Sequence, residues 1–342
     1  MANSRLPPLN RPVRMQEVAE LADVSTMTVS RALRDPASVS DATLDRVSAA
    51  VRKLGYIPNQ LASSLKTFNR TKLMGVIVPS VRNAIFADSL KGLSDELRHH
   101  GFIVMLADGH YSPSEEEALI SAFLAQRARA MVLHETVHTP AAEAQLRSAG
   151  IPIVEIGNLS RKPLDMVVSY SNALAARAMT QHLVDRGYRR IAFISLPRTI
   201  PRSVERLKGY RSALKRAGIP FDDALVQETE GGYAAGAKAM SRILDARPRA
   251  DAAFFAGDVL AVGGLLECQR RGISVPSEMA IAGFDDLEIA TQLTPALTTL
   301  RVPRYEIGLQ AARLILGRLT RTGTEQGGVH DVGFEVMARD ST

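Results

Sequence analysis

The sequence predicts an α/β protein: a small all-α helix-turn-helix headpiece followed by a two-lobed α/β core with parallel sheets. Two short amphipathic stretches separated by a tight break lie within residues 13–57. From Lys72 onward, apolar runs alternate with amphipathic helical stretches, and this alternation comes in two similar sets, before and after about residue 168. Because alternating strand and helix units form parallel sheets covered by helices, we expect two lobes of that kind.

The first two expected helices form a helix-turn-helix. Spacing of i, i+3, i+4 and i+7 predicts a first helix with one buried face, at Met15, Val18, Ala19 and Ala22. Ser25 is a good N-cap for the second helix, because its hydroxyl can accept from free backbone N–H groups. Such a pair presents the N-terminal end of its second helix to the major groove of DNA.

A third helix is expected to begin after Ser40 and to end at Gly55. Its apolar stripe is Leu44, Val47, Val51 and Leu54. Pro58 then disfavours helix at the residue before it, and Asn59 can cap a new, very short helix. One or two isolated turns are unstable alone in water, so we expect this hinge helix to order only with DNA and a partner chain.

Composition sets the class of protein. The 42 Lys and Arg and 36 Asp and Glu give 42 − 36 = +6, and residues 1–70 alone give 10 − 6 = +4, as expected of a module that faces phosphates. The single cysteine, Cys268, excludes an intramolecular disulfide and fits the cytoplasm. No apolar run approaches the length of a membrane span, and residues 1–12 hold three prolines and no signal-peptide core.

These observations predict four segments: a flexible tail over residues 1–12, the headpiece over 13–57, a hinge helix and linker over 58–70, and the two-lobed domain over 71–342. Strands of the core are expected over 73–79, 102–107, 130–134, 153–156, 166–168, 191–196, 252–256, 280–284 and 333–337. Helices are expected over 89–99, 114–127, 173–186, 203–217, 235–246 and 261–271. Ligands of such sheets sit off the C-terminal ends of the strands, so a cleft between two lobes would gather several of those ends.

Several stretches, followed along the chain, resemble the headpiece and hinge of the LacI-type bacterial transcription regulators: residues 15–19, 24–33, 39–40 and 54–59, with Ala62 and Leu65. The resemblance implies a periplasmic-binding-protein-like core whose chain crosses between the lobes. Residues 298–301 resemble the crossing back to the first lobe, and 334–342 the return to the second. No leucine heptad follows Thr342, so the resemblance implies a homodimer on palindromic double-stranded DNA.

The resemblance also assigns DNA-binding roles. Thr26 and Met27 lie where the family reads base edges, and the methionine offers apolar contact to a thymine methyl group. Arg31 can reach guanine or clamp a phosphate, and Arg34 can do either. Phosphate contacts, which position the protein without specifying sequence, are expected at Thr28, Ser30, Tyr56 and Asn59.

In the hinge, the resemblance implies that Leu65 and its counterpart in the partner chain wedge into a central base step and kink the DNA from the minor groove. Ala62 suits close packing of the two hinge helices. The alternative for Leu65 is a core position in a linker helix.

On the ligand side, the resemblance implies an effector site in the cleft, formed by Asn83, Phe86, Glu155, Arg206, Tyr233, Asp258 and Asp285. An arginine fork such as that of Arg206 suits a carboxylate or paired hydroxyls. Asp285 can accept from sugar hydroxyls, with a helix N-cap as its alternative, and Asp286 is the better capping candidate. Two glycines depart from the family pattern: Gly157 stands where many relatives have an aspartate, and Gly257 where many have an asparagine. We expect Glu155, which points to the same sheet face as Gly157, to compensate for the missing carboxylate.

The sequence therefore predicts a cytoplasmic, dimeric, ligand-responsive transcription regulator, most simply a repressor. Short pieces at 138–140, 149–155, 164–165 and 175–180 resemble the gluconate-repressor branch of the family, which implies gluconate or 2-ketogluconate as the effector. Two other classes are a sugar enzyme fused to a DNA-binding head and a sugar-transport binding protein. A further alternative is a transcription regulator whose effector acts as a corepressor or is a different sugar.

The sequence lacks the patterns of catalytic and cofactor sites. It has no nucleophile elbow, dinucleotide-binding glycine motif or P-loop, so no enzyme and no cofactor is predicted. The histidines do not fall at metal-ligand spacing, because His134 and His138 bracket Glu135 without a second spaced cluster.

Overall fold

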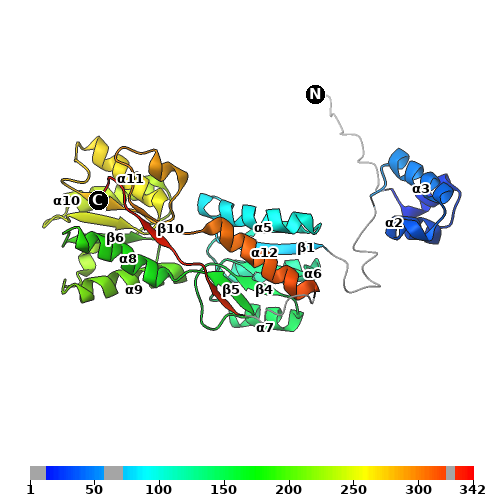
Figure 1. Cartoon of the computed structure of the whole chain (residues 1–342), viewed down its shortest axis with the longest axis horizontal. Coiled ribbons are helices and arrows are strands. Elements are labelled where there is room, and N and C mark those ends of the chain that lie inside the picture. Colours follow the sequence, from blue (N-terminus) through cyan, green and yellow to red (C-terminus); the bar gives the residue numbers. More distant parts are fainter. Residues whose placement is uncertain (1–12, 58–71, 321–327) are drawn as a thin grey trace, which may run out of the picture. The chain divides into compact units, whose positions relative to one another are not determined.

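The computed structural model describes residues 13–57, 72–320 and 328–342. The chain divides into two compact units, Met1–Thr71 and Lys72–Thr342. Figure 1 shows the helices and strands of each unit, which are described separately below. Across the described ranges, no helix is long and apolar enough to cross a membrane.

The headpiece contains the three predicted helices, α1 (Met15–Ala22), α2 (Thr26–Arg34) and α3 (Asp41–Leu54), with a 3-10 turn at Pro36–Ser38. Ser25 caps α2 by accepting from the backbone N–H of Thr28 at 3.1 Å, and Ser40 caps α3 in the same way. Gly55 ends α3 in the left-handed conformation, at φ 64°. Each helix supplies one fully buried valine to the core: Val18, Val29 and Val47. The expected caps and buried faces are confirmed.

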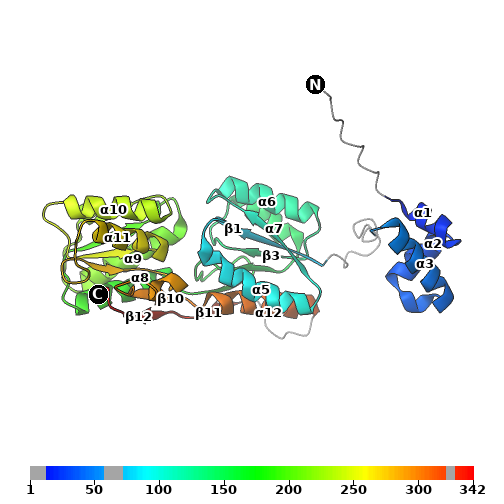
Figure 2. The same cartoon turned by 90° about the horizontal axis from the view of Figure 1, so that it is seen from above.

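The first lobe is built on a six-stranded parallel sheet in the order β11-β5-β4-β3-β1-β2. The strands are β1 (Leu73–Val78), β2 (Ile103–Asp108), β3 (Ala130–Leu133), β4 (Ile153–Glu155), β5 (Met166–Ser169) and β11 (Val329–Asp331). Figure 2 shows α5 (Ala87–His99) and α12 (Arg304–Thr320) on one face, and α6 (Pro113–Ala125) and α7 (Pro140–Ala149) on the other. The side chains of β1 alternate between two hydrophobic cores, one on each face of the sheet. Met74 and Val76 pack into one core, and Ile77 packs into the other.

The second lobe repeats this plan with a four-stranded parallel sheet in the order β7-β6-β8-β9. Its strands are β6 (Ile191–Ser195), β7 (Val226–Glu228), β8 (Ala252–Phe255) and β9 (Ala280–Ala282). Helices α8 (Asn172–Asp185) and α9 (Pro201–Arg216) pack on one face. Helices α10 (Tyr233–Asp245) and α11 (Asp258–Arg270) pack on the other.

The chain passes between the lobes three times: between β5 and α8, between β10 (Thr299–Arg301) and α12, and between β11 and β12 (Glu335–Met337). β10 and β12 pair antiparallel, which confirms the expected late crossings. The expected last strand over 333–337 is found as β12, but the strand before it, β11, was not predicted. Gly333, at φ 70°, separates two short strands that belong to different sheets. The helices α7 and α12 and the short strands β7, β10 and β11 were not among the predicted elements.

Candidate functional site

The surface of α2 carries the side chains predicted to meet DNA. Val29 and Ala32 are buried against the other helices, which turns the opposite face outward. Met27 is 70% exposed, and Thr26, Arg31 and Arg34 are exposed as well. Thr28 and Ser30 are partly exposed, and the Thr28 hydroxyl lies 2.9 Å from that of Ser25. This face therefore offers one long apolar side chain, hydroxyl groups and two cations from a single helix.

The other predicted DNA-binding residues are placed differently. The ring of Tyr56 packs in the headpiece core and is only 8% exposed, so any phosphate contact would fall to its hydroxyl. Asn59, Ala62 and Leu65 lie outside the described residues.

A cavity of about 500 Å³ lies between the two lobes, which is within the usual size range for small-molecule sites. Loops that follow the strands line it. The first lobe contributes Ser80, Arg82, Asn83, Ile85 and Tyr111, and the second contributes residues 196–206, 230–232, 256–260 and 285 in part. A smaller cavity of about 120 Å³ adjoins it and shares Tyr111, Thr199 and Ile200. Strand ends of both lobes therefore meet at one site, as the fold class predicts.

Arg206 organises the second-lobe wall. Its guanidinium donates from Nε to Asn172 Oδ1 at 2.8 Å, from Nη1 to the Ala256 carbonyl at 2.7 Å and from Nη2 to the Tyr170 hydroxyl at 3.2 Å. Its Cζ atom lies 3.7 Å from the centroid of the Phe284 ring. The predicted residue is thus in the cavity wall, but most of its donor capacity is already used by the protein.

Asp285 is the predicted carboxylate of the same wall. It is 4% exposed and lines the cavity, and its φ of 116° is a conformation that a non-glycine residue adopts only under constraint. Burial raises its pKa, while the charges of Arg206, Arg304 and Arg202 oppose that rise. Because no described residue donates to its side chain, both oxygens are available to accept hydrogen bonds from a ligand.

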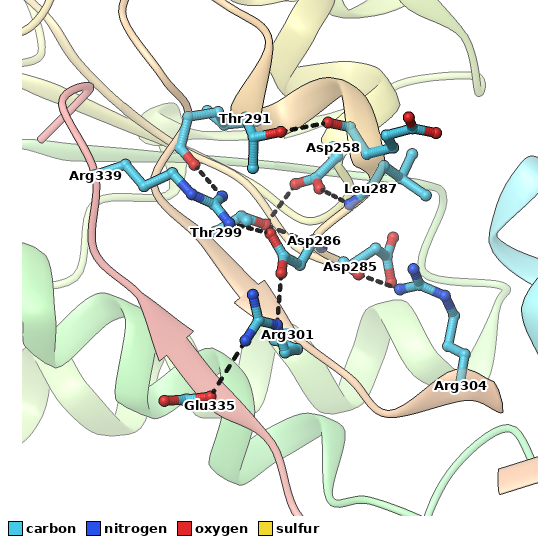
Figure 3. A network of polar contacts seen from close by, with 12 residues as sticks. Asp258, Asp285, Asp286, Leu287, Thr291, Thr299, Arg301, Arg304, Glu335 and Arg339 are labelled. Atoms are coloured by element: carbon cyan, nitrogen blue, oxygen red, sulfur yellow. Dashed lines mark hydrogen bonds and ion pairs between the residues drawn. The ribbon is translucent and has the colours of Figure 1, made fainter. Parts of the chain in front are cut away.

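The corner beside Asp285 explains how this backbone is held. The Asp285 N–H donates to the Leu300 carbonyl at 2.9 Å, and Arg304 donates to the Asp285 carbonyl. Asp286 pairs with Arg301 at 2.7 Å and with Arg339 at 2.5 Å. Figure 3 shows the two aspartates turned apart, with Asp286 in contact with Arg301 and Arg339. Asp286 is therefore a residue that anchors the corner rather than a helix cap.

Arg202, which the sequence analysis did not select, lies one turn before Arg206 on α9. It is 7% exposed and lines the cavity. Its Nη2 lies 3.3 Å from Glu135 Oε1 of the first lobe, but its buried Nε has no partner, and it donates no hydrogen bond to any described residue. The i, i+4 spacing from Arg206 was the signal that would have revealed it.

Glu155 does not compensate for Gly157, which corrects the prediction. Its carboxylate lies 3.2 Å from His138 Nε2 and accepts from the backbone N–H of Leu164 at 2.9 Å, inside the first lobe and away from the cavity lining. The other nitrogen of His138 lies 2.7 Å from Glu116 Oε2. Burial opposes the charged ring, but the hydrogen bonds to Glu116 and Glu155 outweigh it and raise the pKa of His138 to about 9.

Gly157 itself has no room for the family's aspartate. A Cβ atom at this position would lie 1.6 Å from the His134 carbonyl oxygen. The departure from the family pattern is therefore built into the backbone path of the first lobe.

Three further predicted residues do not line the large cavity. Asp258 is fully buried, and its two oxygens accept from the Thr299 hydroxyl at 2.5 Å and the Leu287 N–H at 2.8 Å. Phe86 is 2% exposed and packs edge-on against His134. Tyr233 is 51% exposed, and only Glu230, Gly231 and Gly232 represent its loop in the lining. Asn83 does line the cavity, with its Oδ1 accepting from the Ile85 N–H at 3.2 Å.

A metal centre has no support in the part of the chain that the structure describes, where no group of three or more His, Cys, Asp or Glu side chains is placed to hold an ion. The chemistry of the cavity is that of recognition: two buried cations, a buried carboxylate and apolar walls.

Two family models match this chain, one in each of the two compact units of the fold. Residues 14–59 match the model described as bacterial regulatory proteins, lacI family. Residues 180–342 match the model of a periplasmic binding protein-like domain.

Individual relatives span nearly the whole chain. The HTH-type transcriptional regulator GntR of Escherichia coli K12 is 36% identical over 310 residues, which cover 90% of this chain and 92% of that protein. The HTH-type transcriptional repressor CytR of the same strain is 33% identical over 330 residues, 96% of each chain. The crystal structure of a LacI-family transcriptional regulator from Silicibacter pomeroyi superposes with a TM-score of 0.88 at 33% identity, covering 96% of this chain and 99% of that one.

Proposed function

The chain belongs to the lacI family of bacterial regulatory proteins, and from this premise we propose that it is a dimeric repressor released from a palindromic operator by a sugar acid. The observation that carries the ligand class is the cavity between the lobes, where two buried arginines and an unpaired aspartate face the same space. A carboxylate suits the cations, and a chain of hydroxyls suits Asp285. Gluconate and 2-ketogluconate have both groups.

The DNA-binding part of the proposal rests on α2. Met27 reads a thymine methyl group, Thr26 contacts a base edge, and Arg31 reaches guanine or a phosphate. Thr28 and Ser30 contact phosphates and position the helix. The hinge residues Asn59, Ala62 and Leu65 complete the interface by the role that the family resemblance gives them.

Release requires that the effector bind one arrangement of the lobes more tightly than another. The cavity is lined from both lobes, so a ligand that fills it changes how they contact each other. In the dimer, this change alters how the two first lobes present the hinge helices, and the operator is released.

The test begins with selection of binding sites from a random DNA pool by the purified full-length protein. Gluconate, 2-ketogluconate, ribose and hypoxanthine are then titrated into the complex with the selected site. We expect a palindromic site and release by one of the acids alone. If ribose or hypoxanthine released the DNA and neither acid did, the sugar-acid assignment would be refuted, but the protein would still be a DNA-binding regulator. Tighter DNA binding with an acid would assign it as corepressor.

The DNA contacts are tested in the same selection. Met27→Ala is expected to change the preferred base at one position of each half-site, whereas Thr28→Ala is expected to weaken binding to every sequence. An unchanged motif with Met27→Ala would exclude base reading by Met27.

A further inference from the structure

Arg202 and Arg206 lie one turn apart on α9 and are equally buried, at 7% exposure each. Each guanidinium lies over an aromatic ring, Phe86 for Arg202 and Phe284 for Arg206, but their hydrogen bonding differs. Arg206 donates three hydrogen bonds to protein groups and stacks on Phe284. Arg202 has a buried Nε without a partner and donates to no described residue. A buried guanidinium with unused donors is costly unless a ligand completes it.

The carboxylate that forms an ion pair with Arg202 comes from the other lobe. Glu135, which follows β3, brings Oε1 to 3.3 Å from Arg202 Nη2, yet this oxygen is buried and lacks an aligned hydrogen bond. A carboxylate that forms two parallel hydrogen bonds with the guanidinium would satisfy Arg202 better than this contact does. Glu135 is therefore placed as a weak internal counterion, in contact with the cation at the cavity wall.

We propose that Arg202 is the residue that selects a carboxylate in the effector, and that Glu135 is the internal competitor which the effector carboxylate displaces. This inference rests on the proposed sugar-acid function and deepens it, because it names the anchor of the acid group. Arg206 then shapes the wall rather than binding the acid. The hydroxyls of the ligand are left to Asp285, which lines the same cavity.

The geometry limits where the displaced carboxylate goes. Glu135 also lines the smaller cavity of about 120 Å³, beside Tyr111, Thr199 and Ile200, which are common to both cavities. Space therefore exists on the first-lobe side for the Glu135 side chain when an acid takes its place. The same displacement removes an ion pair that joins the two lobes.

The test is isothermal titration of the full-length protein with D-gluconate and with D-glucitol, which has the same carbon chain without the acid group. We expect the wild type to prefer gluconate, Arg202→Met to lose roughly 100-fold in gluconate affinity, and its preference for the acid to disappear. Arg202→Lys, which keeps the charge without the fork, should fall between them. Glu135→Gln removes the competitor and should bind gluconate about tenfold more tightly, a gain that misfolding does not produce.

The matched control is Arg198→Met, because Arg198 pairs with Glu228 and Asp223 and is not part of the cavity lining. It removes the same charge nearby and should leave gluconate affinity unchanged. Arg202→Met binding gluconate as tightly as wild type would overturn the inference while the sugar-acid function stands. A wild type that binds D-glucitol and not gluconate would overturn both.

Discussion

The two lobes hold their buried charges differently around the cavity. In the first lobe, the buried cluster of Glu116, His138 and Glu155 lies outside the lining of the large cavity, and both carboxylates contact the histidine. The second-lobe wall, on α9 and the loop after β9, presents Arg202 and Arg206 with Asp285. The carboxylates of this first-lobe cluster are paired within the lobe, whereas the second-lobe wall keeps unused donors and acceptors. The difference supports the proposal that the second lobe recognises the acid and hydroxyl groups of the ligand.

Within the second-lobe wall, the two arginines of α9 are expected to differ most in how much each contributes to stability. Arg206→Ala should lower the free energy of unfolding of the effector unit by about 3–5 kcal/mol, because Asn172, Ala256 and Tyr170 lose buried partners. Arg202→Ala should cost only about 1–2 kcal/mol, since it makes no aligned hydrogen bond. Urea denaturation of both variants measures this, and a larger loss for Arg202→Ala would reverse the two roles.

A second comparison concerns one glycine from each lobe, Gly157 in the first and Gly231 in the second. Gly157→Ala should destabilise the protein by about 3 kcal/mol or more, because the new Cβ would overlap the His134 carbonyl of the neighbouring strand end. Gly231→Ala is the matched control. Its nearest non-neighbouring atom is a Leu196 methyl carbon at 3.8 Å, so the change in stability should stay within about 0.5 kcal/mol. Stability is measured by thermal unfolding. If both variants were destabilised equally, the backbone around Gly157 would move to accommodate the new Cβ atom, contrary to this prediction.

The third prediction concerns the buried first-lobe cluster of Glu116, His138 and Glu155. The folded-state pKa of His138, about 9, lies above its ordinary value of 6.5. A raised histidine pKa gives stabilisation that is complete below pH 6.5 and is lost as the pH rises through 9. The wild type should therefore lose about 2–3 kcal/mol of stability over that window relative to His138→Gln. The free energy of unfolding is measured against pH for both proteins. Curves that run parallel between pH 6.5 and 9 would show that His138 does not contribute this pH-dependent stability.

These comparisons also explain what the sequence could and could not predict. The headpiece was readable residue by residue because caps and helix faces are local: Ser25, Ser40 and Gly55 act within one turn of their position. The alternation of strands and helices likewise predicted two parallel sheets. The caps of the first lobe are as local, with Thr139 before α7 and Gly150 after it, yet α7 and α12 were not predicted.

The cavity was harder, because motif position says which loop a residue occupies and not what its side chain meets. Arg206 and Asp285 were placed correctly in the wall. Glu155 and Asp258 were not, because each satisfies its carboxylate with groups far along the chain, His138 in one case and Thr299 in the other. For Arg202, the i, i+4 spacing from Arg206 places the side chain on the same helix face, but spacing does not show that its Nε lacks a hydrogen-bond partner within the described residues.

The smallest predicted effect separates the two aspartates of the second wall. Burial, and after it the charge of Asp285, raises the pKa of Asp258 to about 7, against the hydrogen bonds from Thr299 and Leu287. A carboxyl group whose pKa is raised on folding loses stability as the pH rises from 3.8 through 7. Asp258→Asn should therefore stabilise the protein by about 1 kcal/mol at pH 8 and have little effect near pH 4.

The amide suits this site because its oxygen can accept from the Leu287 N–H and its NH2 group can donate to the Thr299 hydroxyl. Asp258 does not line the cavity, so gluconate affinity should be unchanged in Asp258→Asn but reduced in Asp285→Asn, which loses the free acceptors. Stability is measured by urea denaturation at the two pH values, and affinity by titration calorimetry. If Asp258→Asn folds normally and yet loses gluconate, Asp258 binds the effector as its sequence position predicted, and the division between the two aspartates fails.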